Sequence, residues 1–180
     1  MTFNKQYIGK AVKLIVISVF LFSLNSCKSS KLPSSKSTTK SIPKTTTSKP
    51  VLNETASAII KYAEQFKGVK YKYGGTTKKG MDCSGLLYTS FQSEGINLPR
   101  RSEDIAKTGD WIDLKAVQPG DLVFFATQKN SRKVNHVGLV TGIREGYVEF
   151  IHASTSAGVI TSSLAERYWY FAFVQARRLL

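Results

Sequence analysis

The sequence predicts an α+β fold in which N-terminal helices pack on a mostly antiparallel sheet of five to six strands. Within residues 51–180, apolar residues first recur at helical spacing, and β-branched and aromatic runs separated by turn residues dominate beyond Trp111. Helices followed by antiparallel strands favour a fold that packs one face of its sheet against the helices. A segment of this length can bury a core without disulfides, so we expect a single domain over 51–180.

Two helices are expected before the strands. The first runs over 56–66 after the possible cap Asn53, and the second runs over 82–95 with Asp82 as its N-cap. A glycine follows or ends each of them, which is typical of a helix stop. A third, short helix is expected over 102–107.

The second half of the domain predicts strands joined by tight turns. Turns are expected at 119–121 and 145–146, and a short helix at 163–168. The predicted strands are 122–126, 134–143, 148–151 and an aromatic-rich last strand over 169–176.

The N-terminus has the pattern of a secretory signal. Three lysines precede an apolar stretch over 14–24, and Leu24, Ser26 and Cys27 follow with the spacing of a bacterial lipobox. An apolar stretch of this length rises roughly 16 Å, about half a bilayer core, which disfavours a permanent membrane span. We therefore expect residues 1–26 to be a lipoprotein signal peptide and Cys27 to carry the lipid. An uncleaved anchor, or an ordinary leader followed by a chance cysteine, is the alternative.

Residues 27–50 are rich in Ser, Thr, Lys and Pro and contain no acid, so they predict a disordered tether. Nine of the 26 lysines and arginines precede residue 51 and all 12 acids follow it, which leaves the domain a formal charge of +5 out of +14. A basic exported tether favours anionic phospholipid or cell-wall polymer over nucleic acid. A spacer that is merely soluble is the alternative.

Cys83 and two histidines are the candidates for chemistry. If Cys27 carries a lipid, Cys83 is left as an unpaired thiol outside the cytoplasm. Its predicted place at the first turn of a helix favours a thiolate, because free amides and the helix dipole stabilise an anion there. His136 and His152 are the only histidines, and they lie on strands joined by a hairpin, so both can stand on one sheet face. A thiol nucleophile, an imidazole base and a second imidazole that orients the first follow the logic of a catalytic triad. A buried structural cysteine with core histidines, or a zinc site made by the three residues, is the alternative.

These motifs resemble the NlpC family of papain-like bacterial cell-wall peptidases. The resemblance covers nearly all of 54–176 and rests on residues 71–85, the turn 118–125, the sequence His-Val-Gly at 136–138 and the later His152. The signal and tether are similar to those of the family's single-domain lipoproteins, and the resemblance implies the papain-like NlpC fold.

The resemblance also implies a role for each site residue. Cys83 would be the nucleophile, His136 the base and acid, and His152 the orienting residue. Tyr71 would help to bind the oxyanion, with Tyr73 as the alternative. Asp82 and Ser84 flank the nucleophile and would touch substrate, although capping explains Asp82 equally well.

The implied reaction is hydrolysis of an amide bond in the peptide stem of peptidoglycan, between D-γ-glutamate and the diamino acid. No metal or organic cofactor is expected, and we expect a monomer whose partners are stem peptides and, through Cys27, a membrane. The expected place is the cell envelope, with the lipid in the outer membrane and the domain facing the periplasm. Basic residues Arg100, Arg101 and Lys133 could meet stem carboxylates, although solvated surface charge explains them as well. A related amidase or acyltransferase, or a wall-binding module without activity, remains open.

Overall fold

The computed structural model describes residues 53–180. The predicted signal peptide, the lipidated Cys27 and the tether lie outside the described residues and stay predictions. Within 53–180, no helix combines the length and the apolar character that crossing a bilayer requires.

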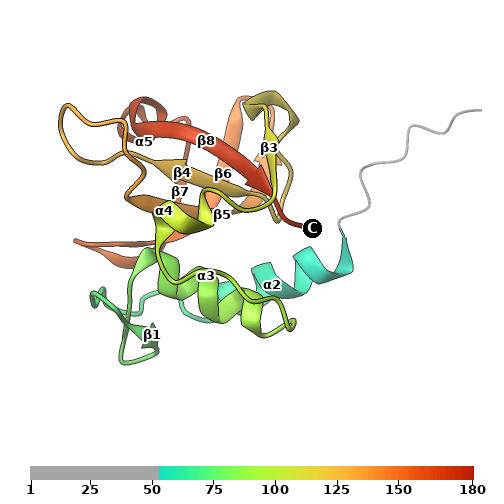
Figure 1. The fold of residues 1–180 in the computed structure, drawn as a ribbon, viewed down its shortest axis with the longest axis vertical. Helices are drawn as coiled ribbons and strands as arrows, with labels where there is room; N and C mark the ends of the chain where they lie inside the picture. The colour runs from blue at the N-terminus through green and yellow to red at the C-terminus, as the bar shows by residue number, and fades with distance from the viewer. Residues whose placement is uncertain (1–52) are drawn as a thin grey trace, which may run out of the picture. The chain divides into compact units, whose positions relative to one another are not determined.

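The described residues form helices packed against a six-stranded antiparallel sheet, which confirms the predicted α+β class (Figure 1). The strands lie in the order β3-β8-β4-β5-β6-β7, and a small hairpin of β1 and β2 lies apart from this sheet. The helical elements are α2 (Glu54–Glu64), α3 (Cys83–Gln92), α4 (Ser102–Ile105), the 3-10 turn η1 (Leu114–Ala116) and α5 (Arg167–Ala172). The strands are β1 (Thr76–Thr77), β2 (Gly80–Met81), β3 (Asp110–Ile112), β4 (Leu122–Phe125), β5 (His136–Arg144), β6 (Tyr147–Ser154), β7 (Gly158–Ser163) and β8 (Phe173–Arg178).

The large sheet separates two apolar cores. Successive side chains of β4 alternate between them, so Leu122 and Phe124 pack with α2 and α3, whereas Val123 and Phe125 pack with α5 on the other face. All four side chains are fully buried. The central strands are therefore apolar on both faces, and they hold the starts of β5 and α3 in fixed places.

Two caps predicted from the sequence are present. The Asn53 side chain accepts a hydrogen bond from Thr55 N at 3.0 Å at the start of α2, and Asp82 Oδ1 accepts one from Gly85 N at 2.7 Å at the start of α3. Each cap satisfies an amide that the first helical turn leaves without a partner. The predicted starts of these two helices are thus confirmed.

The C-terminal part differs from the prediction in three places. Residues 158–163 form β7, which was not predicted, and the helix expected over 163–168 begins later, at Arg167. The run predicted as a strand over 169–176 is divided between α5 and β8. Its aromatic content favours a strand locally, but Trp169 and Ala172 stand three residues apart and bury one face of a helix against the second core.

Candidate active site

Asp82 fixes the amino end of α3 through a dense set of hydrogen bonds. Its carboxylate accepts from Gly85 N and Gly74 N, each at 2.7 Å, and from both terminal nitrogens of Arg100 at 2.8 Å. Burial alone would raise the pKa of Asp82, but the hydrogen bonds from Arg100 and from the two amides outweigh it and hold this pKa below its usual value. Ser84 joins the same network, because its hydroxyl donates to Asp82 Oδ1 at 3.3 Å and accepts from Arg100 Nη1 at 2.8 Å.

A glycine lets the first turn of α3 approach the preceding loop. A Cβ at Gly85 would fall well inside contact distance of the Gly75 carbonyl oxygen. Asp82 N donates to the same carbonyl at 3.2 Å, which ties the start of the helix to the loop that carries Tyr71 and Tyr73. The Asp-Cys-Ser-Gly sequence therefore supplies the cap, the thiol and the close approach in four consecutive residues.

Cys83 is the first residue of α3, and its thiol lines a cleft of about 590 Å³. Burial raises its pKa, and the backbone amide of Val137 is the main influence in the opposite direction. Asp82 adds to the increase, since a neighbouring carboxylate disfavours a second negative charge. The amides of Cys83 and Ser84 at the helix start lower this pKa, as the sequence predicted, but desolvation outweighs them and the net shift is upward. Cys83 rests as a neutral thiol.

The two histidines form a hydrogen-bonded chain that ends on a serine. His136 Nε2 and His152 Nδ1 are 2.9 Å apart, and His152 Nε2 lies 3.1 Å from Ser162 Oγ. β5, β6 and β7 are consecutive in the sheet, and each contributes one member of this chain. The prediction that both imidazoles share one sheet face is confirmed.

Ser162 was not predicted as a site residue. Its strand was missed, and a serine in a stretch rich in Ser and Thr gives no signal of its own. A search for polar residues on the strand after His152 would have found it only if β7 had been recognised.

The chain of hydrogen bonds couples the tautomers of the two imidazoles. If His136 donates from Nε2, His152 accepts at Nδ1 and must carry its own hydrogen on Nε2, which then donates to the Ser162 hydroxyl. Nδ1 of His136 is left free to accept another proton. The arrangement suits a neutral base supported from behind.

Burial keeps both imidazoles neutral. Desolvation lowers the pKa of His136 to about 4, and desolvation together with the adjacent His136 lowers the pKa of His152 to about 3. Trp169 of α5 contributes to this burial, since its ring stacks on His136 with centroids 5.4 Å apart and meets His152 edge-on at 4.6 Å. The helix that was predicted as a strand thus covers the catalytic candidates.

The structure places Cys83 beside the backbone of β5, and neither His136 nor His152 is among the residues that line its cleft. The sulfur lies beside the amide of Val137, the residue after His136, but no hydrogen bond within residues 53–180 connects the thiol to either imidazole. Such bonds often form only when substrate is present.

The predicted tyrosines both line the cleft. Burial and the nearby Cys83 and Asp82 raise the pKa of Tyr71, so its hydroxyl keeps its proton and can donate to an anion. Tyr73 is largely exposed at the cleft edge. Arg100, Arg101 and Lys133 also line the cleft, as their sequence position suggested, but each is paired with an acid: Arg100 with Asp82, and the other two with Glu103. The carboxylate of Asp82 is engaged by two amides and Arg100, so it orients the helix start, and its contact with substrate stays a prediction.

The described residues contain no preformed site for the zinc ion that the sequence left as an alternative. In the part of the chain that the structure describes, no group of three or more His, Cys, Asp or Glu side chains is placed to hold a metal ion.

Comparisons with known proteins agree with this architecture. Residues 68–178 match the model of the NlpC/P60 family. The chain is 40% identical over 125 residues to "Murein DD-endopeptidase MepS/Murein LD-carboxypeptidase" of Escherichia coli strain K12, covering 69% of this chain and 63% of that protein, so it spans less than two thirds of that relative. It is 40% identical over 88 residues to "Gamma-D-glutamyl-L-lysine dipeptidyl-peptidase" of Bacillus subtilis strain 168, covering 49% of this chain and 30% of that protein. Among solved structures, an NlpC/P60 family protein from Bacillus cereus superposes with a TM-score of 0.62 at 32% identity, covering 68% of this chain and 39% of the other.

Proposed function

Because the chain belongs to the NlpC/P60 family, we propose that it is a peptidoglycan hydrolase that cuts an amide bond of the stem peptide with Cys83 as nucleophile. The observation that carries the proposal is the position of this thiol: it lies at the amino end of α3, inside an open cleft, beside the strand that begins with His136. Nucleophile, base and orienting group then come from three rigid elements of one domain.

The proposed reaction begins with a neutral pair. Nδ1 of His136 takes the proton of the Cys83 thiol as the sulfur attacks the carbonyl carbon, and the carbonyl oxygen becomes an oxyanion. The Tyr71 hydroxyl and the free amides at the start of α3 are the available donors to that oxygen. The imidazolium of His136 then protonates the leaving amine, which leaves a thioester on Cys83.

Water completes the cycle. His136, neutral again, removes a proton from a water molecule that attacks the thioester, and the same proton returns to the sulfur as the acid product leaves. His152 steadies the transient charge on His136 by accepting from its Nε2–H, and Ser162 holds His152 in the tautomer that allows this.

We assign the bond between D-γ-glutamate and the diamino acid as the one that is cut. The name of the Bacillus subtilis relative describes that linkage, whereas the name of the Escherichia coli relative describes a DD-linkage of murein. The DD-crosslink is therefore the competing assignment, and the two bonds give products with different new amino termini.

Digestion of purified sacculi by the full-length chain, followed by mass spectrometry, tests this function. We expect soluble fragments in which the diamino acid is cut from D-glutamate and carries a new free α-amine, and none from the Cys83→Ala variant. A new amine produced by cutting the crosslink would move the assignment to a DD-endopeptidase, and loss of the whole stem from the sugar would make the chain an amidase.

Two further results would contradict the assignment of Cys83 as nucleophile or the proposed hydrolase activity. Equal release by wild type and Cys83→Ala would remove Cys83 as nucleophile. If both the wild type and Cys83→Ala bound sacculi and neither cut them, the chain would be a wall-binding module.

We also propose that Cys27 carries a lipid that holds the domain at the cell envelope, in the outer membrane and facing the periplasm. The support is the order of basic residues, apolar stretch and lipobox in the sequence. Metabolic labelling with an alkyne fatty acid should mark the wild type and leave Cys27→Ala unmarked. Equal labelling of both proteins would contradict the assignment.

A further inference from the structure

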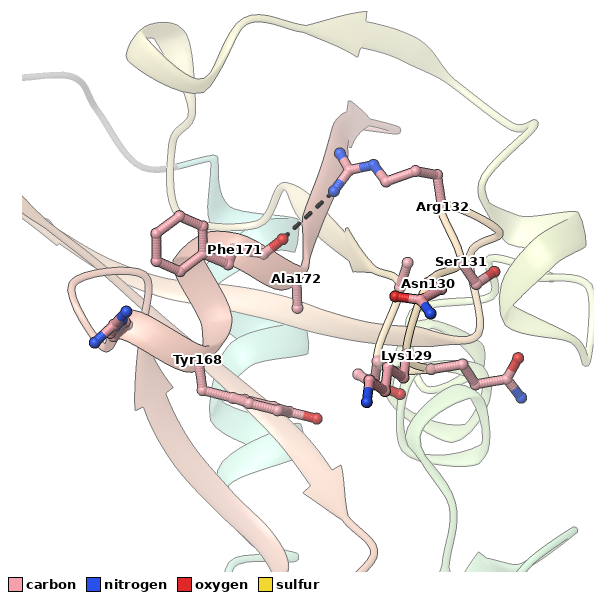
Figure 2. A pocket seen from close by; sticks show the side chains of 11 residues that line it. Lys129, Asn130, Ser131, Arg132, Tyr168, Phe171 and Ala172 are labelled. Atoms are coloured by element: carbon pink, nitrogen blue, oxygen red, sulfur yellow. Dashed lines mark hydrogen bonds between the residues drawn. The ribbon is translucent and has the colours of Figure 1, made fainter.

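A second hollow lies beside the cleft, between α5 and the loop over 126–135. Its volume is about 800 Å³, and the loop segment 126–132 forms one side while α5 forms the other. Figure 2 shows the hydroxyl end of Tyr168 directed from α5 toward the loop that carries Lys129. Two aromatic rings of α5 are unusually open to solvent, since Tyr168 is 58% and Phe171 is 65% exposed.

The hollow is basic. Its lining includes Lys129, Arg132 and Arg167 and contains no acid. None of these three cations forms a salt bridge within residues 53–180, although the three basic residues that line the catalytic cleft all do. Arg167 lies 5.8 Å from the centre of the Phe171 ring, so a cation and an aromatic surface are presented together.

The loop wall of this hollow is anchored. Thr127 N donates to Asn135 Oδ1 at 2.8 Å, and Asn135 Nδ2 donates back to Thr127 Oγ1 at 2.9 Å, which closes the base of the loop. Arg132 ties the loop to the end of α5 by donating to Phe173 O at 2.9 Å and to Phe171 O at 3.4 Å, the contact drawn in Figure 2. A hollow with a fixed wall needs little reordering to bind a ligand.

The hollow and the catalytic cleft are adjacent and share one lining residue. Gln128 lines both, and the next part of the same loop, Lys133 to Asn135, lines the cleft alone. α5 lies next to both the hollow and the imidazoles, because Tyr168 lines the hollow and its neighbour Trp169 packs on His136 and His152. A polymeric substrate held at Cys83 can therefore extend past Gln128 into the basic hollow.

We propose that this hollow is an auxiliary subsite for the second stem peptide of crosslinked murein, whose free carboxylates meet Lys129 and Arg167 while its aliphatic part lies on Tyr168 and Phe171. The proposal rests on the proposed function, since it assumes that one stem peptide occupies the cleft. Charge and shape complementarity favour this occupant: a stem peptide carries several carboxylates close together on an aliphatic backbone, whereas a glycan strand without its peptides carries only one lactyl carboxylate on each N-acetylmuramic acid. The subsite would make the enzyme prefer crosslinked wall over single stems.

Binding tests the subsite without depending on cleavage. The full-length chain with Cys83→Ala is titrated calorimetrically with a purified crosslinked muropeptide dimer and with the uncrosslinked monomer. We expect tighter binding of the dimer, and adding Lys129→Gln and Arg167→Gln should reduce that preference by about five-fold, the value of two solvent-accessible ion pairs. The preference should also shrink as salt concentration rises.

A matched pair of substitutions controls for charge alone. Lys61→Gln with Lys79→Gln removes the same charge from exposed residues that line neither hollow, and it should leave the dimer preference intact. Equal loss in both double variants, or no preference in the parent, would overturn the subsite.

The same variants separate the other occupants. Binding of stem-free glycan strands or of anionic phospholipid vesicles that is lost with Lys129→Gln and Arg167→Gln, while the dimer preference stays, would assign the hollow to that ligand and overturn the proposal. If the wild type cut neither muropeptide, the proposed function would be wrong. The dimer preference measured in the Cys83→Ala protein would still test the subsite independently.

Discussion

The two halves of the candidate site are held by different physics. The nucleophile side is ionic: Asp82 and Arg100 form a charged, partly solvated network that fixes the start of α3. The base side is neutral: His136, His152 and Ser162 form a chain of uncharged hydrogen bonds against Trp169 and Phe150. The difference suggests a division of work, in which charge sets the position of the thiol and exclusion of water keeps the imidazoles unprotonated, so that one lone pair stays free at neutral pH.

Acidification should separate the two halves most clearly. Both histidines have a lower pKa when folded than the ordinary value of 6.5, so the unfolded chain binds protons first and stability falls as pH drops below about 6.5. His136 alone should remove up to about 3 kcal/mol by pH 4. Asp82, whose folded pKa is depressed, keeps its contribution until the pH falls below about 4.

Urea unfolding measured from pH 7.5 to 3.5 checks this order. In a variant with His136→Gln and His152→Gln, the free energy of unfolding should no longer fall between about pH 6.5 and 4. In Asp82→Asn this fall should remain. A wild-type stability that is flat between pH 6.5 and 4.5 would contradict buried neutral imidazoles.

The variant Asp82→Ala should lose about 2 kcal/mol of unfolding free energy, less than acidification removes. A helix cap and the partner of Arg100 are lost together, but Arg100 can still reach water. The matched control is Asp104→Ala, which breaks an exposed pair with Lys107 and should change the free energy of unfolding far less. Thermal unfolding of both variants at pH 7 gives the comparison. Similar losses in the two variants would mean that the Asp82 network does not hold the helix start.

The smallest expected effect comes from Ser162→Ala. His152 would lose the acceptor that fixes its tautomer, and we expect kcat for stem-peptide cleavage to fall about ten-fold with KM unchanged. Ser162→Thr should restore most of the rate, because it returns a hydroxyl to the same position, and Ser163→Ala should change little. If only KM changed, or if Ser162→Thr did not restore kcat, Ser162 would be a packing residue.

Much of the nucleophile side could be predicted from the sequence, because its determinants are local. Asp82, Cys83 and Gly85 are consecutive or nearly so, and capping, helix start and close approach act within one turn. The pairing of His136 with His152 followed from a hairpin, which is also local.

The remaining parts of the site depend on tertiary contacts. The bond from Arg100 to Asp82 spans 18 residues, and Ser162 lies on a strand with no clear alternating pattern. The sequence around Trp169 predicts a strand, but the residue lies in a helix because that helix buries one face in the second core. The raised pKa of Cys83 was missed for the same reason, since desolvation depends on what packs around the thiol and not on its position in the helix.

The central claim is that the site rests as a neutral thiol and a neutral imidazole. The rate of alkylation of Cys83 by iodoacetamide, measured against pH in a Cys27→Ser background, tests it most directly. The account predicts a single rise with a midpoint above the ordinary thiol pKa of about 8.5, and a rate near neutral pH that falls further in His136→Gln. A fast plateau already present below pH 7, the signature of a thiolate paired with an imidazolium, would contradict it.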